Sequence, residues 1–330
     1  MRALSLRGPR QFEFIELPEP SPPGPDEALV SVRAIGLCGT DLSGYLGKMP
    51  FIQYPRILGH ELGVEVLAVG GNVTHLEVGD HCSVEPYLNC GTCHSCSLAK
   101  TNCCEVLQVL GVHRDGGMTH QLILPAHKLH SSKSLTFSQL AIVETLAIGC
   151  HAVDRASVSA ASSVLIIGAG PIGLSVLEFA RLKTNKVAVV ERDQKRREFI
   201  QRHYSEVTVF DVTASLPTFE LVFDATGNAN SMAESINHAQ FGGRIVYVGI
   251  TSEPIPLNDA LFHRRELSLL ASRNACSSDF PKIIGLIESG PIDTSPWITC
   301  TCNFEGAPAL FADLVDGRIK VVKAIIETPF

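Results

Sequence analysis

The chain has 330 residues, of which 18% are charged and 45% apolar, and its formal net charge is −7. The length suggests one large domain or two, and the composition is typical of a folded globular protein. The acidic balance, with no run of Lys or Arg, argues against a nucleic-acid-binding surface. No apolar run reaches the ~18 residues of a membrane span, and the first residues lack a secretory pattern. We therefore expect a cytoplasmic protein with no membrane partner and with reduced cysteines.

Residues 1–150 are predicted to be rich in β-strands. Residues 28–36 alternate between apolar and polar side chains, as a half-buried strand does. The stretch before them, 17–27, has too many prolines for a strand interior and is predicted to be a surface loop. Residues 63–70 and 81–87 are expected to form two further strands joined by a polar link.

Five cysteines lie between residues 90 and 104. Four of them, Cys90, Cys93, Cys96 and Cys104, have the C-x2-C-x2-C-x7-C spacing of a tetrahedral zinc site made of thiolates. Because all four ligands would come from one loop and leave no open position, such a site would be structural. A cluster of free thiols and a redox C-x-x-C pair are the alternatives, and four ordered ligands in one loop favour zinc.

The pattern changes near residue 150, where continuous apolar strands begin to alternate with helices. This alternation predicts a parallel sheet with helices on both faces. From about residue 295 the sequence pattern is again irregular, with a predicted helix near 307–317 and a predicted closing strand at 320–330. The fold class is therefore α/β. A doubly wound, Rossmann-type dinucleotide-binding domain is expected at 151–294, and a β-rich domain is expected from 1–150 together with 295–330.

Gly168, Gly170 and Gly173 form a G-x-G-x-x-G turn between a predicted strand and a predicted helix. Gly168 permits the tight turn, Gly170 lets the backbone approach a pyrophosphate, and Gly173 lets the helix and strand pack closely. Glu191 ends the next strand, 23 residues after Gly168. Its carboxylate would bind ribose hydroxyls and repel a 2′-phosphate, which favours NAD over NADP, although the adjacent Arg192 weakens this preference. The alternative is a strand–turn–helix whose glycines serve packing alone.

Six stretches resemble, in this order, the zinc-dependent medium-chain dehydrogenases of the sorbitol and threonine dehydrogenase branch: GLCGTD, YPRILGHE, CGTCHSC, VETLAIGCHA, VLIIGAGPIG and FDATGN. The resemblance covers essentially the whole chain. Within the branch, TNCCEVLQVLGVHRDGG, FDATGN and ASRNACSSDFPKI resemble the sugar-acid dehydrogenases that oxidise L-galactonate or L-gulonate at C5. The family implies that the β-rich domain is GroES-like. It also implies that the fourth cysteine ligand is Cys104, since the x7 spacing fits the family, and that Cys103 is the spare.

The resemblance implies a second, catalytic zinc site at which one position stays open for the substrate. Cys38, His60 and a carboxylate would hold this zinc, and the carboxylate is either Glu61 or Glu144. A ligand set of this kind with an open position suits a catalytic zinc. The zinc would lower the pKa of the substrate alcohol, which would then lose a hydride to the nicotinamide.

Other positions near this site are also implied by the resemblance. Thr40 matches the hydroxyl that takes the alcohol proton, and Asp41 matches a buried acid beside the ligands. The chain departs from the family pattern at Ser43, where many relatives have a histidine that relays the proton, so the proton route is left open. It also departs at Met118 and His120, which are expected to alter the wall of the substrate pocket. A half-exposed strand position is the alternative for His120.

The cofactor and substrate residues complete the set that the resemblance implies. The cofactor residues are Gly168, Gly170, Pro171, Ile172, Gly173, Glu191, Arg192, Arg196, Thr226, Gly227, Val248 and Gly249. A sugar acid needs a cation to hold its carboxylate. Arg273 and Asn274 match family positions near the active cleft, and Arg114 ranks second because it has the character of a surface-loop charge. Lys320 and Lys323 are expected to be solvated.

The leading hypothesis is an NAD-dependent zinc alcohol dehydrogenase with two zinc ions per chain, which oxidises a secondary alcohol such as a polyol or sugar acid. The resemblance implies a homodimer or homotetramer. One alternative is a dehydrogenase of the same fold for L-threonine or a simple secondary alcohol. Another, from a different class, is a zinc-ribbon interaction module that is not an enzyme. The acidic charge and the set of Cys38, His60 and Glu144 argue against the interaction module.

Overall fold

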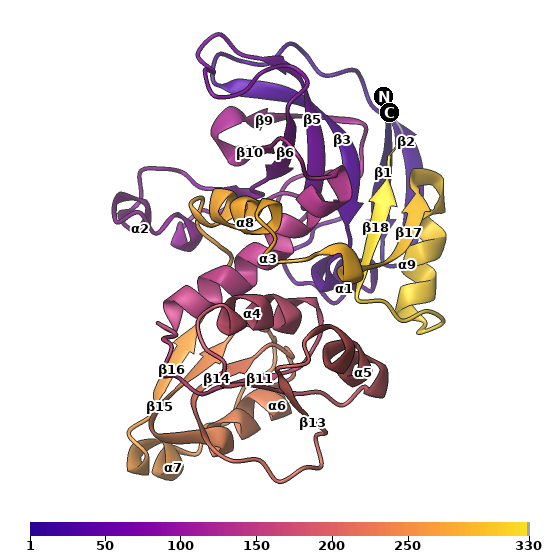
Figure 1. The fold of residues 1–330 in the computed structure, drawn as a ribbon. Coiled ribbons are helices and arrows are strands. Elements are labelled where there is room, and N and C mark those ends of the chain that lie inside the picture. Colours follow the sequence, from indigo (N-terminus) through magenta and orange to yellow (C-terminus); the bar gives the residue numbers. More distant parts are fainter. Residues whose placement is uncertain (329–330) are drawn as a thin grey trace. The chain divides into compact units, whose positions relative to one another are not determined.

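A computed structural model describes residues 1–328, which divide into two compact units (Figure 1). Unit 1 contains Met1–Glu144 and the described residues from Cys276 onward, and unit 2 contains Thr145–Ala275. The sequence placed these boundaries at 150/151 and 294/295. The long helix α3 (Phe137–Arg155) begins in unit 1 and continues into unit 2.

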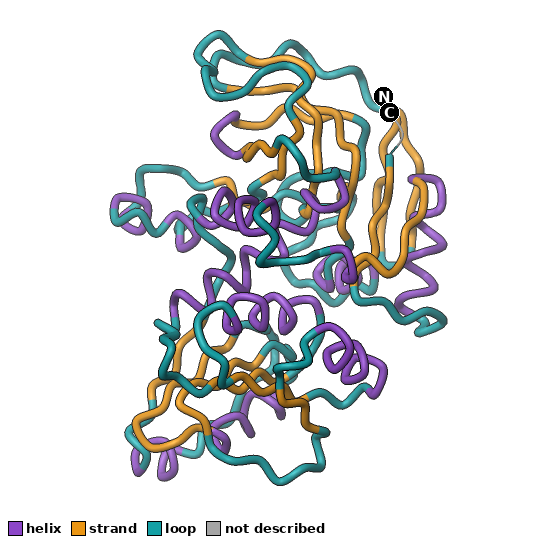
Figure 2. The backbone as a smooth tube through the Cα atoms, viewed as in Figure 1, coloured by secondary structure: helices purple, strands orange, loops and turns teal. Residues whose placement is uncertain are grey.

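Unit 1 is built mainly from strands, as Figure 2 shows. A seven-stranded sheet has the order β10-β6-β5-β3-β18-β17, with β9 also paired to β3, and a smaller sheet has the order β2-β1-β4. The strands are β1 (Arg2–Gly8), β2 (Gln11–Glu16), β3 (Glu27–Gly36), β4 (Arg56–Ile57), β5 (Glu61–Val69), β6 (His81–Val84), β7 (Tyr87–Leu88), β8 (Gln108–Val109), β9 (Gln121–Pro125), β10 (Leu129–Ser132), β17 (Ile298–Asn303) and β18 (Lys323–Glu327). The helices besides α3 are α1 (Gly39–Tyr45), α2 (His94–Ser97), α8 (Asp279–Glu288) and α9 (Ala307–Val315).

Strand β3 is the centre of unit 1 because it pairs with β5, β9 and β18. Its apolar side chains belong to the large buried core of this unit. The last described strand, β18, lies antiparallel to β3, with Ile326 opposite Ile35. Part of the predicted closing strand, residues 329–330, lies outside the described residues. Residues 298–303, expected to be irregular, form β17, which pairs in parallel with β18.

The segment 276–294 lies in unit 1, although the sequence placed it in the nucleotide-binding domain. Its helix α8 contacts β10 through side chains from both ends. The Ser132 hydroxyl donates a 2.5 Å hydrogen bond to Glu288 Oε1. Near the start of the helix, the Phe280 ring stacks on His130 with centroids 4.9 Å apart. These contacts are long-range in sequence, so the strand–helix alternation could not locate them.

Unit 2 contains a six-stranded parallel sheet of order β13-β12-β11-β14-β15-β16. Its strands are β11 (Val164–Ile167), β12 (Val187–Val190), β13 (Thr208–Phe210), β14 (Phe219–Asp224), β15 (Ala239–Tyr247) and β16 (Ser268–Ala271). Its helices are α4 (Pro171–Arg181), α5 (Gln194–His203), α6 (Ala229–Glu234) and α7 (Asp259–Arg264), besides the end of α3. Strands β11 and β12 are almost wholly buried, which explains their continuous apolar sequences. The predicted α/β fold class is confirmed.

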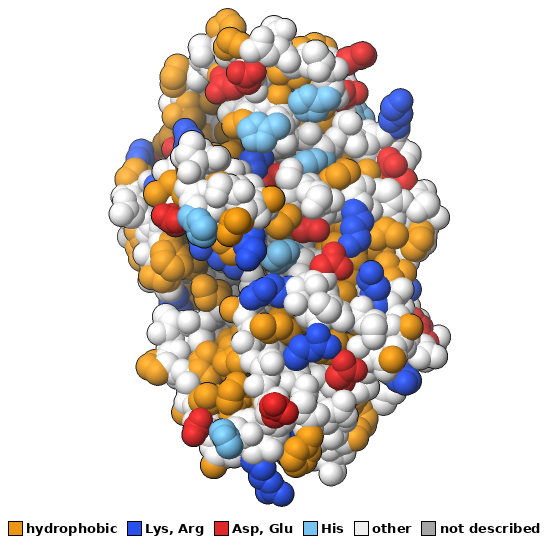
Figure 3. Space-filling view, turned by 90° about the vertical axis from the view of Figure 1, so that its left-hand side faces the viewer, with side chains coloured by type: hydrophobic (Ala, Val, Ile, Leu, Met, Phe, Trp, Pro, Cys, Tyr) orange, Lys and Arg blue, Asp and Glu red, His pale blue; other side chains and the backbone are white. Residues whose placement is uncertain are grey.

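Charged side chains of both signs are interspersed on the face drawn in Figure 3, where Lys and Arg lie among Asp and Glu. Within residues 1–328, every helix is too short or too polar to cross a membrane.

Gly63 in β5 is a position where the fold excludes a side chain. A Cβ atom there would overlap the main-chain carbonyl of Phe137 at the start of α3. We expect Gly63→Ala to lower the free energy of unfolding by about 1–3 kcal/mol, since overpacking of this kind forces the backbone to shift. Urea unfolding measures the change.

The matched control is Gly285→Ala in α8, where an added Cβ would meet nothing within 4 Å. Alanine is the better helix former, so this variant should unfold at the wild-type urea concentration or slightly above it. Equal midpoints for both variants would contradict the packing argument.

Candidate functional site: two metal-ligand groups and a glycine turn

Cys38 lies in the short link between β3 and α1, where Asp41 fixes the chain. The Cys38 main-chain N–H donates to Asp41 Oδ2 at 3.0 Å. The other carboxylate oxygen of Asp41 accepts from Gly59 N at 3.3 Å, and this acid is fully buried. Asp41 therefore ties the turn that carries Cys38 to the turn that precedes His60.

One ligand atom each from Cys38, His60 and Glu61 lies within 4.8 Å of the others, a separation that a metal ion can bridge. His60 Nδ1 is buried, lies 3.5 Å from Asp41 Oδ1 and makes no hydrogen bond to the described residues. Burial opposes protonation of His60, but the negative charges of Asp41 and Cys38 outweigh it and hold its pKa well above the usual value. The group thus favours added positive charge. A thiolate, an imidazole and a carboxylate are also the ligands that zinc prefers.

Glu61 forms a buried ion pair that the sequence did not predict. Both of its carboxylate oxygens lie 2.6 Å from Lys323 Nζ, and each of the two side chains is only 1% exposed. Lys323 also donates to the carbonyl of Leu37 at 3.3 Å. Gly36 leaves room for the carboxylate, because a Cβ there would overlap Glu61 Oε2. The expectation that Lys323 is solvated was therefore wrong, whereas Lys320 is exposed.

Glu144 in α3 lies in the same unit but outside this close group of ligand atoms. Its Oε1 accepts a short hydrogen bond from the Tyr87 hydroxyl. Burial raises the pKa of Glu144, and the charge on Glu61 adds to the rise while His60 partly offsets it. Tyr87 is a residue that sequence reasoning missed. It lies 57 positions away from its partner, so no local pattern could have indicated it.

The other positions predicted around this site lie in different surroundings. Thr40 and Ser43 are half-buried on α1, and Arg114 is exposed. Met118 is fully buried in the core of unit 1. His120 packs against the Phe304 ring and lines a cavity of about 430 Å³, whose lining also includes Met1 and Arg33 but none of the candidate metal ligands.

The cysteine loop brings the sulfur atoms of Cys90, Cys93, Cys96 and Cys104 within 4.8 Å of one another. Backbone N–H groups of Thr92 and Cys93 point at Cys90 Sγ and lower the pKa of this thiol to about 6. Burial raises the pKa of the Cys96 thiol to about 11, so the thiols of the group differ in how readily they ionise in the absence of a metal ion. The cysteines all lie within residues 1–328, and in that part of the chain each of them is a free thiol.

The glycine turn of unit 2 links β11 to α4. Gly168 has a positive φ of 93°, and a Cβ at Gly173 would overlap the carbonyl of Gly168, so close packing explains both glycines. Gly170 precedes α4, and a Cβ there would meet only Arg196 Nη1 at 3.7 Å. The backbone is therefore open to a ligand at Gly170, beside Pro171 and Ile172 of the helix N-terminus.

Glu191 follows β12 and holds this turn through its side chain. It accepts from Ala169 N at 2.6 Å and from Asp193 N at 2.8 Å. Arg196 Nη1 lies 3.9 Å from its carboxylate, and Arg192 is exposed. A buried carboxylate with an arginine on one side is thus present where the adenosine ribose was expected.

The remaining predicted residues of unit 2 follow β14, β15 and β16. Asp224 accepts from Thr226 N at 2.9 Å and from its hydroxyl at 2.6 Å, which fixes the turn at Gly227. Gly249 packs so closely on Gly227 that a Cβ would overlap its amide nitrogen, and Val248 N donates to the Asp224 carbonyl at 2.9 Å.

Two predicted substrate residues follow β16 directly. Arg273 is exposed. Asn274 has a positive φ of 52°, and its Nδ2 is buried without a hydrogen bond to the described residues.

Comparison with known protein families matches two stretches of the chain to family domains. Residues 24–134 match the alcohol dehydrogenase GroES-like domain, and residues 171–289 match the zinc-binding dehydrogenase domain. The chain belongs to the zinc-binding alcohol dehydrogenase family. This confirms the resemblance and makes the protein an oxidoreductase of alcohols with a nicotinamide cofactor, rather than an interaction module.

Individual members of this zinc-binding dehydrogenase family match nearly the whole chain. L-galactonate-5-dehydrogenase of Escherichia coli K12 is 32% identical over 99% of this chain and 98% of its own length. The structure of an alcohol dehydrogenase (rspB) from Escherichia coli CFT073, complexed with NADH, is 28% identical with a TM-score of 0.91 and covers 99% of both chains. A zinc-binding dehydrogenase from Sinorhizobium meliloti 1021, bound to NADP, is 26% identical with a TM-score of 0.88 over 99% of this chain and 98% of its own.

The adjacent pair Cys103 and Cys104 gives a test of the cysteine loop. Cys104 is buried within the sulfur group, whereas Cys103 is exposed and outside it. We expect Cys104→Ser to lose one metal ion per chain and Cys103→Ser to lose none, as measured by elemental analysis after gel filtration. Equal metal content in the two variants would contradict the assignment of Cys104.

Proposed function

We propose that this dehydrogenase oxidises a secondary hydroxyl of a sugar acid, of the L-galactonate or L-gulonate type, and passes the hydride to NAD. The 32% identity to L-galactonate-5-dehydrogenase over 99% of the chain is the observation that carries this choice of substrate. Polyols belong to the same substrate class, since they present the same secondary hydroxyl groups.

A catalytic zinc is proposed at Cys38, His60 and one of the carboxylates Glu61 and Glu144. The buried ligand atoms support it, as does His60 Nδ1, which has no hydrogen bond to any described residue. When bound, a zinc ion at this group supplies Lewis-acid stabilisation to the substrate oxygen as its proton leaves. Lys323 orients Glu61 through both carboxylate oxygens, and Tyr87 orients Glu144 through one oxygen.

Thr40 is proposed to take the proton from the substrate hydroxyl. It follows Cys38 by two residues on α1, and its side chain is half-buried. Ser43, three residues further along α1, has no imidazole that could relay the proton. Proton exit in this chain is therefore assigned to water or the cofactor ribose.

The second zinc is proposed in the loop of Cys90, Cys93, Cys96 and Cys104, where it is structural. A closed set of four thiolates leaves no position for a substrate. The four sulfur atoms, which lie within 4.8 Å of one another, support this proposal.

NAD is proposed as the preferred cofactor. The open backbone at Gly170 and the N-terminus of α4 would receive the pyrophosphate. The buried carboxylate of Glu191 would accept from ribose hydroxyls and repel a 2′-phosphate. Arg196 and the exposed Arg192 flank it, and together they reduce this discrimination against NADP.

Arg273 and Asn274 are proposed to bind the substrate carboxylate, with Arg114 as the second candidate cation. A guanidinium group is suited to a carboxylate because it offers paired donors. Asn274 Nδ2 supplies a buried donor with no protein acceptor among the described residues.

A homodimer or homotetramer is also proposed. Strand β16 is the last strand of the sheet in unit 2, and its SLLA sequence is largely exposed, with Leu269 41% accessible. An apolar strand with an unpaired edge is a template for pairing with a second copy.

A substrate screen tests the proposed reaction. L-galactonate and L-gulonate should give a higher kcat/KM with NAD than sorbitol, simple secondary alcohols or L-threonine, because their carboxylate adds a charged contact. NADP should give a lower kcat/KM than NAD with the same substrate. Formation of NADH at fixed pH is the measurement, and a highest kcat/KM with L-threonine would refute the sugar-acid assignment.

Substitution of Cys38 separates the metal site from the cofactor site. Cys38→Ser should lower kcat at least about 100-fold, because a metal ligand is lost, while the Kd for NADH stays near wild type. The initial rate of NADH formation measures turnover, and NADH fluorescence measures cofactor binding. The exposed Cys103→Ser variant is the control and should keep full turnover. A Cys38→Ser protein with wild-type kcat would rule out Cys38 as an essential ligand.

A further inference from the structure

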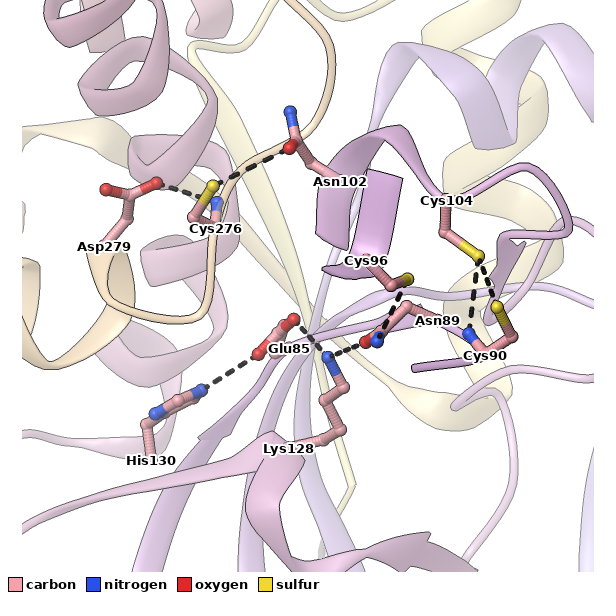
Figure 4. Close-up of polar contacts among 10 residues, drawn as sticks. All are labelled: Glu85, Asn89, Cys90, Cys96, Asn102, Cys104, Lys128, His130, Cys276 and Asp279. Carbon is pink, nitrogen blue, oxygen red and sulfur yellow. Dashed lines mark hydrogen bonds and ion pairs between the residues drawn. The ribbon is translucent and has the colours of Figure 1, made fainter. Parts of the chain in front are cut away.

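The cysteine loop has little apolar core of its own to hold it. Cys90 is exposed, Cys93 and Cys96 are half-buried, and none of the four residues of α2 is buried. Hydrogen bonds also connect the loop to the buried part of unit 1. Figure 4 draws one chain of such contacts that leads from Cys96 to the β-sheet.

The buried end of this chain is an ion pair. Lys128 follows β9 and is 3% exposed, and its Nζ lies 2.5 Å from Glu85 Oε1. Glu85 is itself 1% exposed, and its second oxygen lies 3.4 Å from His130 Nε2. His130 stacks on Phe280 of α8. The position of Lys128 is thus well defined, because its partner Glu85 is also held by His130 through the second carboxylate oxygen.

Lys128 also decides how the side-chain amide of Asn89 is oriented. Its Nζ donates to Asn89 Oδ1 at 2.9 Å. An ammonium group has no acceptor, so it must face the amide oxygen and not the amide nitrogen. The NH₂ group of Asn89 consequently points the other way, where Nδ2 lies 3.8 Å from Cys96 Sγ. Lys128 therefore selects the orientation of the Asn89 amide in which the donor Nδ2 faces Cys96 Sγ.

We propose that Asn89, oriented by the buried pair of Lys128 and Glu85, donates an N–H···S hydrogen bond to the Cys96 thiolate and slows the loss of metal from the cysteine loop. This rests on the structural zinc of the proposed function. A hydrogen bond to an ionised acceptor is stronger than one to a neutral group. Partners of this kind orient metal ligands, and their loss typically weakens metal binding about 10–100-fold.

The test uses the zinc-loaded protein and two substitutions at Asn89. Asn89→Ala removes both contacts of the amide. Asn89→Asp keeps an oxygen for Lys128 but places a carboxylate, which cannot donate, beside Cys96. Thr92→Val is the comparison, because it removes a hydroxyl that donates to Cys90 Sγ at 3.6 Å from an exposed position, where water can replace the lost donor.

Zinc release into excess chelating dye is followed, and the phase that is absent in Cys104→Ser is assigned to the loop. We expect Asn89→Ala and Asn89→Asp to release this zinc about 10–100-fold faster than wild type, and Thr92→Val to stay near wild type. The cobalt-substituted Asn89→Asp protein should also show a shifted thiolate charge-transfer band, which a role in loop packing alone would leave in place.

The outcomes separate this inference from the function on which it rests. Wild type with two zinc ions per chain and an unchanged release rate in Asn89→Asp would overturn the role of Asn89 alone. Wild type without tightly bound zinc in the loop would overturn the structural zinc site, and the inference with it. A faster release in Thr92→Val equal to that in Asn89→Ala would show that any lost donor has the same effect, and would also overturn the special role of Asn89.

Discussion

The ion pair between Lys323 and Glu61 is sealed from solvent where β3, β5 and β18 meet. Burial of a charge is costly unless it is paired, and removal of one partner of a buried pair typically costs about 3–5 kcal/mol. Lys323 begins β18, so the pair requires the returning segment to lie beside β3. Gly36 is required as well, because only glycine leaves room for the carboxylate. One electrostatic constraint thus links the C-terminal segment of unit 1 to the candidate metal ligands.

Glu61 and Glu144, the two carboxylates beside His60, have different hydrogen-bond partners. Glu61 has both oxygens at Lys323, so a full positive charge offsets its own. Glu144 has a neutral hydrogen-bond donor, Tyr87, and burial raises its pKa. A group whose pKa is raised holds its proton to higher pH. The two carboxylates therefore differ in their surroundings, since one faces a buried ammonium group and the other a phenol hydroxyl.

Local features of this protein could be predicted from the sequence, and long-range contacts could not. The glycine turn and the cysteine spacing depend on residues within about twenty positions, and the structure has Gly173 against Gly168 and four sulfurs together. The burial of Lys323 depends on Glu61, which is 262 positions away. A lone lysine near a strand has no pattern that distinguishes a solvated side chain from a paired one. The burial of Met118 likewise depends on a core whose residues come from strands far apart in the sequence.

The two candidate metal groups of unit 1 share a charge arrangement. Lys128 and Lys323 are the buried lysines of the described residues, and each is paired with a buried glutamate. Lys323 contacts a candidate ligand directly, whereas Lys128 acts through Asn89. The difference follows from the charge of the ligands. Zinc with four thiolates carries a net charge of −2, which N–H dipoles can stabilise without a second full charge among the sulfurs. A site with one thiolate, one imidazole and one carboxylate is close to neutral with zinc. Because Glu61 and Glu144 are both present there, the second carboxylate adds a negative charge, and Lys323 offsets it.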